Sequence, residues 1–199
     1  MFPDRIVSSP VLLRTFLTSD APRVRMLAGD ARVAEPTGVV PHPYGDHVAE
    51  GWIASHEHTR TTGAEFVYAI TRHEDGVLVG AIALRPMANE HENLGYWVGH
   101  PYWGHGYATA AAQALVALAF SWLDCNVLTA SHLARNAASG RVMEKCGFSV
   151  IRRGTRPHRG ALEDYVVCGI TAEAWQQWIE HGAAGDRRDA TASSPASRS

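Results

Sequence analysis

Two glycines, Gly104 and Gly106, mark the stretch of this chain that is best suited to chemistry. Residues 94–98, Leu-Gly-Tyr-Trp-Val, have the composition of a strand, and the alanine-rich residues 110–120 have that of a helix. The first N–H groups of a helix lack intrahelical partners and carry partial positive charge, so they bind phosphate well. The stretch 93–109 therefore predicts an anion site at a helix start, although an ordinary strand-to-helix connection with turn glycines leaves the same pattern.

A second motif, Asn136-Ala-Ala-Ser139, precedes Glu-Lys-Cys-Gly-Phe at residues 144–148. Together with Leu-Gly-Tyr-Trp and the glycine loop, it resembles the GNAT family of acetyl-CoA-dependent N-acetyltransferases, and in particular its RimJ/RimL-type branch. The resemblance covers about residues 11–170. It implies an α/β (α+β) GNAT fold, in which helices flank a mixed central sheet of about seven strands and a splayed parallel pair of strands binds acetyl-CoA.

The resemblance also implies which residues bind acetyl-CoA. The backbone at Trp97 and Val98 would bind the pantetheine arm as an added strand. Asn136 matches the position that hydrogen-bonds the cofactor arm or the substrate, and Ser139 matches the position near the thioester sulfur. The pyrophosphate would bind the backbone N–H groups of the glycine loop, which are those of Trp103, Gly104, His105, Gly106, Tyr107 and Ala108. Only the glycine positions are demanding there, because the side chains of this loop can vary.

Acetyl transfer to an amine needs a base for the substrate ammonium. Many relatives carry glutamate where this chain has Asn93 and Ala110, so the obvious base is absent. Glu92 is the adjacent carboxylate and our first candidate, although strand alternation points it to the opposite face from residue 93. Glu90, His132 or a chain of waters are the rival candidates.

The reaction also needs a donor for the developing oxyanion and a proton for the departing thiolate. The backbone N–H of Val98 suits the oxyanion. Many GNAT enzymes place an acid tyrosine where this chain has Met143. Ser139, acting directly or through water, is therefore the best candidate acid.

The elements that must position these residues follow from composition and periodicity. The proline-rich residues 35–44 predict a loop, and residues 152–163 predict a polar connection. Residues 66–70 and 77–84 predict an antiparallel hairpin. The full set has strands at 11–17, 66–70, 77–84, 94–98, 127–131, 148–151 and 165–170, and helices that begin after Asp20 or cover 47–58, 110–120, 136–145 and 172–180.

The composition indicates a soluble globular protein. A chain of 199 residues with 46% hydrophobic content can bury one sizeable core. A formal net charge of −2 provides no basic field that would hold nucleic acid or an anionic membrane. No apolar run reaches the roughly 18 residues that span a bilayer, and the start lacks the apolar core of a signal peptide. We expect a cytoplasmic protein without nucleic acid or membrane as a partner.

The three cysteines, Cys125, Cys146 and Cys168, are odd in number and widely spaced, which suits neither a disulfide framework nor a metal knuckle. No His-Glu-x-x-His occurs, so no metal is expected. We expect an N-terminal extension at residues 1–10 and the acetyltransferase domain at 11–181. A disordered tail is expected at 182–199, where apolar periodicity is absent.

Two protein classes other than an acetyltransferase are compatible with parts of this sequence. A dinucleotide fold would use Gly104 and Gly106, but Thr109 occupies its third glycine position and Asp124 precedes a strand where the ribose-binding acid belongs at the end of one. The other alternative is a catalytically weak regulatory module that binds acetyl-CoA, which the missing glutamates favour. Turnover of acetyl-CoA over a panel of amines separates this module from an enzyme.

The resemblance implies direct transfer of acetyl from acetyl-CoA to a primary amine in a ternary complex. The acceptor is a protein N-terminus or a small-molecule amine, and the variable residues 35–58 and 152–163 would choose it. No dense acidic run argues for a polyamine, so a peptide N-terminus is slightly favoured. Because the family often dimerises, a homodimer is left open.

Overall fold

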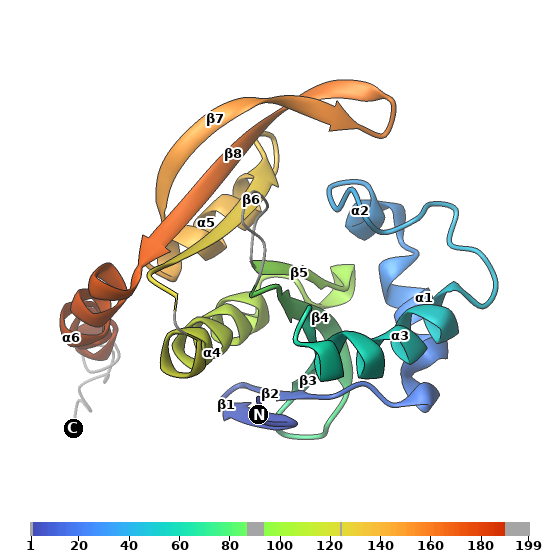
Figure 1. Ribbon diagram of the computed structural model, residues 1–199, viewed down its shortest axis with the longest axis horizontal. Helices are drawn as coiled ribbons and strands as arrows, with labels where there is room; N and C mark the ends of the chain where they lie inside the picture. The colour runs from blue at the N-terminus through green and yellow to red at the C-terminus, as the bar shows by residue number, and fades with distance from the viewer. Residues whose placement is uncertain (1, 87–93, 124, 190–199) are drawn as a thin grey trace, which may run out of the picture.

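The computed structural model describes residues 2–86, 94–123 and 125–189, and side chains as far as residue 181. Eight strands form one sheet in the order β1-β2-β3-β4-β5-β6-β8-β7 (Figure 1). Neighbouring strands are antiparallel except for β5 and β6, which run parallel. The strands are β1 Arg5–Ser8, β2 Val11–Arg14, β3 Phe66–Arg72, β4 Leu78–Leu84, β5 Leu94–Val98, β6 Val127–Leu133, β7 Ser149–His158 and β8 Ala161–Thr171.

The predicted mixed α/β fold is confirmed, with one strand more than expected. The additional strand is β1, which pairs with β2 along its whole length. The first residues are also tied to the sheet, because Phe2 stacks on Phe66 with ring centroids 4.0 Å apart and the Tyr68 hydroxyl donates to the Pro3 carbonyl. Residues 2–8 therefore contribute to the fold although they carry little apolar pattern.

Helices cover both faces of the sheet. They are α1 Ala21–Ala28, α2 Ala31–Ala34, α3 Val48–Thr62, α4 Tyr107–Trp122, α5 Ala137–Lys145 and α6 Ala172–Asp189, with short 3-10 helices at Thr18–Asp20 and His100–Tyr102. Along β3, Tyr68 and Ile70 pack in one core with α4, whereas Ala69 packs in a second core with α1 and α3. This alternation of side chains places α4 opposite α1 and α3. None of the helices in the described part of the chain is long and apolar enough to span a membrane.

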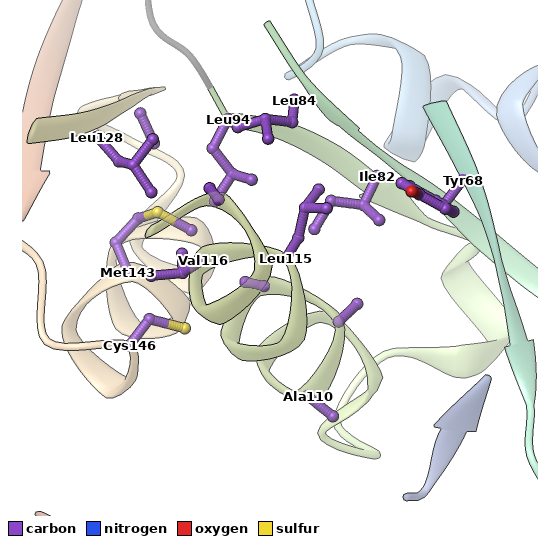
Figure 2. Packing of buried hydrophobic residues seen from close by; sticks show 14 of the residues in the cluster. Tyr68, Ile82, Leu84, Leu94, Ala110, Leu115, Val116, Leu128, Met143 and Cys146 are labelled. Atoms are coloured by element: carbon purple, nitrogen blue, oxygen red, sulfur yellow. The ribbon is translucent and has the colours of Figure 1, made fainter. Parts of the chain in front are cut away.

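The core around α4 explains why the glycine loop has a fixed position. Leu115 and Val116 of α4 are fully buried, and Figure 2 shows them near Leu94, Leu128 and Met143 of the neighbouring elements. Small residues on the same helix, Ala111, Ala112 and Ala119, are also fully buried. They let α4 lie close to the sheet, so the start of α4 is held beside the end of β5.

The sequence-based expectation was wrong for residues 152–163. These residues are not a loop, because β7 and β8 continue pairing as far as His158 and Ala161. Arg159 and Gly160 form the turn, both with positive φ. We call residues 149–171 the hairpin arm. Figure 1 shows it reaching over the rest of the molecule towards α2. Most of the outer strand β7 is exposed, so it has no buried face and no apolar alternation that would reveal a strand.

Two helices are longer than predicted. The helix expected at residues 47–58 runs to Thr62, where Gly63 ends it in the left-handed conformation. The last helix runs to Asp189 where the pattern predicted its end at residue 180. Alanine and charged residues in this extension favour helix without marking an apolar face. The domain limits expected at residues 1–10, 11–181 and 182–199 stay predictions.

Candidate functional site

The glycine loop has the conformation of an anion site. Gly104 has φ of 80° and Gly106, the residue before α4, has φ of 77°. A Cβ atom on either glycine would meet nothing within 4 Å, so backbone conformation and open space above the loop require glycine there. The first backbone hydrogen bond of α4 runs from the Ala110 N–H to the Gly106 carbonyl. The N–H groups of Tyr107 and Ala108 therefore lack helical partners.

A cavity of about 320 Å³ opens beside this loop, and we call it the smaller cavity. Arg141 and Lys145 of α5 line it, one helical turn apart. They add cationic side chains to the helix start, as a bound diphosphate requires. Sequence reasoning missed both residues, although their four-residue spacing behind Asn136 was a usable signal. The predicted cofactor residues on its wall are Trp97, Val98, Trp103, Gly104, Gly106, Tyr107, Ala108, Asn136 and Ser139.

His105 is the predicted cofactor residue that does not line the smaller cavity. Its side chain is exposed, stacks on the Tyr107 ring and has Nδ1 2.8 Å from the Trp103 carbonyl. This position agrees with the expectation that the loop uses backbone groups at residue 105.

The parallel strands β5 and β6 splay as predicted. Within the described chain their only register pair is Leu94 with Ala130, and beyond it β5 and β6 no longer pair with each other. The N–H of Gly99 donates to the Val79 carbonyl of β4. Because backbone groups two residues apart point the same way, those of Trp97 also face β4, while those of Tyr96 and Val98 face the opening.

The register therefore revises one predicted role. Trp97 contributes its side chain to the wall, and the backbone role expected of it passes to Tyr96. The backbone of Val98 faces the opening, as its predicted role requires, and the Trp103 indole N–H donates to its carbonyl at 2.6 Å. The N–H of Val98 faces the opening and is the group available to an oxyanion.

A larger cavity of about 730 Å³ lies next to the smaller one. Tyr44 and Trp52, from the variable residues 35–58, provide aromatic walls, and Arg156 and His158 of the hairpin arm lie on another side. The two cavities meet at shared residues, which are Pro36, Thr37, Tyr96, Trp97, Asn136 and Ser139. Two ligands that enter from these cavities would come together beside Ser139.

Ser139 lies in the first turn of α5, beside a second hydroxyl. Asn136 caps this helix, because its side-chain oxygen accepts from the Ser139 N–H at 3.2 Å. The Ser139 Oγ is 2.8 Å from the Tyr96 hydroxyl. Burial raises the pKa of Tyr96, so its hydroxyl stays protonated at neutral pH. Sequence reasoning looked for a tyrosine at the place of Met143 and missed Tyr96, which strand alternation puts on the same face as Val98.

The predicted base Glu92, together with Glu90 and Asn93, lies outside the described residues. Of the candidates that are described, His132 lines the larger cavity. Cys146 is buried and lines neither cavity, and burial raises the pKa of its thiol to about 12. Within the described ranges, no three His, Cys, Asp or Glu side chains gather in a way that could hold a metal ion.

The hairpin arm and the loop after α2 close over the larger cavity through polar contacts, which we call the roof. His158 donates to the Glu35 carbonyl at 2.7 Å, and Arg159 donates to the carbonyls of Ala34 and Val40. Arg135 adds ion pairs that join Glu35 to Glu163 of β8. These contacts connect two segments far apart in the chain.

Comparison with known proteins assigns the family. A family model described as the acetyltransferase (GNAT) domain matches residues 11–149. The curated relative YdaF of Bacillus subtilis, whose name places it provisionally among ribosomal N-acetyltransferases, is 34% identical over 76 residues. That match covers 37% of this chain, and it spans about two fifths, 42%, of the length of YdaF.

Two solved structures share the fold at lower identity. The microcin C7 self-immunity acetyltransferase MccE, in complex with acetyl-CoA and AMP, has a TM-score of 0.74 at 14% identity, over 85% of this chain and 97% of that one. Mycobacterium smegmatis RimJ, in complex with a CoA disulfide, has a TM-score of 0.70 at 23% identity, over 86% and 89%. The family model covers more than half of the chain, and the names YdaF and RimJ match the branch that the motifs resemble. The chain therefore belongs to the GNAT acetyltransferase family.

Proposed function

We propose that this protein transfers an acetyl group from acetyl-CoA directly to the primary amine at a peptide N-terminus. The observation that carries the proposal is the meeting of two cavities beside Ser139, one with an anion site and one with aromatic walls. The names of YdaF and RimJ support a peptide acceptor, and the ligands in the MccE and RimJ structures support acetyl-CoA. A ribosomal acceptor would place the reaction in the cytoplasm.

The residues of the smaller cavity fit acetyl-CoA. The free N–H groups at the start of α4 and the side chains of Arg141 and Lys145 would bind the phosphates. The backbone of Tyr96 and Val98 would bind the pantetheine arm along the open edge of β5. When bound there, acetyl-CoA supplies the activated acetyl group.

Three groups at the junction would then take part in the reaction, namely the Val98 N–H and the hydroxyls of Ser139 and Tyr96. The Val98 N–H stabilises the negative charge that develops on the acetyl oxygen. Ser139 gives its proton to the sulfur that leaves, and the neighbouring Tyr96 hydroxyl replaces that proton. Direct transfer agrees with the position of Cys146, the buried thiol nearest to α5 in sequence, because it lines neither cavity and stays protonated.

The test is a screen of peptides and small amines with acetyl-CoA, followed by mass spectrometry for products and by thermal unfolding for binding. We expect acetyl-CoA to stabilise the protein and peptides beginning with alanine or serine to be acetylated, since two structures of the same fold are named ribosomal-protein-serine and ribosomal-protein-S5-alanine acetyltransferases. Stabilisation by acetyl-CoA without acetylation of any amine would instead support the regulatory module.

A further inference from the structure

We propose that His132 is the base that takes the proton from the ammonium group of the acceptor. This role rests on the proposed acetyl transfer. His132 would perform the deprotonation for which many relatives carry a glutamate that this chain lacks at residues 93 and 110. His132 lies near the end of β6, beyond the point where β6 separates from β5.

The hydrogen bond of the imidazole sets which nitrogen is basic. The Nδ1 atom of His132 lies 2.9 Å from the backbone carbonyl oxygen of Leu133. A carbonyl oxygen only accepts, so Nδ1 carries the proton and Nε2 carries the lone pair in the neutral ring. No described residue donates to Nε2, and Nε2 is not among the enclosed polar atoms without partners. The lone pair is therefore open to a ligand in the larger cavity.

The ring lies on the wall of the larger cavity, close in the fold to Ser139 at the junction. His132 lines the larger cavity together with Tyr96 and Ser139. Its ring lies against Gly140, where an added Cβ atom would come within 3.1 Å of both Cε1 and Nε2. Gly140 follows Ser139 directly, so the absence of a side chain at residue 140 makes room for the imidazole beside the proposed proton donor.

The other titratable groups around the larger cavity are less suited to accept a proton. Glu65 forms an ion pair with Arg85 at 2.7 Å, and the arginine charge makes the Glu65 carboxylate less able to take a proton. His158 also donates through one ring nitrogen, Nε2, to a carbonyl, that of Glu35, but its side chain is buried in the roof with Nδ1 against Gly38, whereas His132 is partly exposed. The remaining groups that line this cavity are cationic or stay protonated at neutral pH, and they are Arg156, Tyr44 and Tyr96.

The acceptor ammonium loses two protons in the reaction, and the sulfur gains one. The acceptor ammonium breaks one N–H bond and gives that proton to Nε2 of His132, which becomes imidazolium and releases it to water. The neutral amine forms the C–N bond with the acetyl carbon, and the C–S bond breaks. The nitrogen loses a second proton to solvent, while the sulfur gains one from Ser139 and Tyr96, which recover theirs from solvent. One proton is released per turnover.

The kinetic test compares His132→Ala with His181→Ala, acting on peptides that begin with alanine or serine. His181 is a matched control, because its Nδ1 also lies 2.9 Å from a carbonyl, that of Gln177, on exposed α6. We expect His132→Ala to lower kcat by about 100-fold without loss of acetyl-CoA affinity, and added imidazole to restore at least about tenfold. An unchanged kcat, or a loss that imidazole does not restore, would overturn the role.

A second measurement needs no acceptor. Long-range ¹H–¹⁵N spectra of the labelled protein, with His132 assigned by its absence in His132→Ala, report which ring nitrogen is protonated. We expect the Nδ1–H form at neutral pH, and the Nε2–H form would rule out this base. If the wild-type protein acetylates no peptide, the proposed function fails and the base role fails with it. The Nε2–H form in an active enzyme removes His132 alone.

Discussion

The hydroxyl groups of Ser139 and Tyr96 lie 2.8 Å apart where the two cavities meet. Neither residue alone has the features of a strong acid at neutral pH, since serine barely ionises and burial raises the pKa of Tyr96. In the proposed reaction Ser139 gives its proton to sulfur, Tyr96 replaces that proton, and Tyr96 regains one from solvent. The two hydroxyls therefore act as one unit in the proposed reaction.

A double-mutant cycle tests that unit. We expect Ser139→Ala and Tyr96→Phe each to lower kcat by about tenfold or more, with acetyl-CoA affinity nearly unchanged, because the contribution appears in the transition state. The double variant should be no slower than the slower single variant. Losses in kcat that multiply would show that the two hydroxyls act independently.

Gly104→Val should abolish acetyl-CoA binding measured by calorimetry. The valine side chain would fill the open space above the loop, in the path of the phosphates, and would be strained at φ of 80°. Gly63→Val is the matched control, because Gly63 also has positive φ and open space but lines neither cavity. Normal binding by Gly104→Val, or equal losses in both variants, would contradict the assignment of the loop.

At the scale of single residues, the sequence predicted the positions that depend on local geometry. Gly104, Gly106 and the capping Asn136 belong to this group, because a turn or a helix start needs those residue types wherever it occurs. It missed Tyr96 and misassigned the backbone of Trp97. Both depend on which way each residue of β5 faces, and pairing with β4 sets that direction.

At the scale of elements, α3 carries a half-buried histidine, with both ring nitrogens enclosed, that makes folding pH-dependent. His56 packs against the rings of Phe16 and Trp52, and neither of its ring nitrogens has a partner in the described structure. Burial lowers its pKa to about 4. The unfolded chain therefore binds the proton first, so α3 loses stability as pH falls from about 6.5 towards 4.

The free energy of unfolding in urea, measured at pH 7 and at pH 4, tests this pH dependence. The wild-type protein should lose up to ~3 kcal/mol between pH 7 and pH 4 because of His56, and nothing from this group above pH 7. His56→Phe, which keeps the aromatic packing, should lose correspondingly less over the same range. Equal losses of unfolding free energy in both proteins would show that His56 is not buried as described.

The elements themselves were predictable where one face is buried. The core strands β3 and β4 and the helices α4 and α5 have apolar patterns that packing requires. Residues 152–163 of the hairpin arm and strand β1 were missed for the opposite reason, because exposed strands are held by backbone pairing and carry no apolar alternation.

At the scale of the whole molecule, the roof joins the variable residues after α2 to the hairpin arm. Arg135 contacts Glu35 at 2.6 Å and Glu163 at 2.9 Å, and all three side chains are partly exposed. Exposed ion pairs contribute little to stability, so their effect should appear in acceptor binding. The roof thus links acceptor choice to segments that the sequence marked as variable.

Arg135→Ala should raise KM for the peptide acceptor about three- to tenfold, with little change in acetyl-CoA affinity and in the thermal midpoint. Glu163→Gln removes one partner and should change KM in the same direction by less. Steady-state kinetics and calorimetry separate these effects. A change in acetyl-CoA affinity with constant acceptor KM would contradict the assignment of the larger cavity.

We propose acetyl transfer to an α-amine at the junction of the two cavities. The most direct measurement uses a peptide that begins with alanine and contains an internal lysine, incubated with the protein and acetyl-CoA, with the acetylated nitrogen located by tandem mass spectrometry. We predict one acetyl group on the α-amine, and at most about a tenth as much product with Ser139→Ala at the same early time. Acetylation of the lysine alone, or no acetylation while acetyl-CoA binds, would contradict the account.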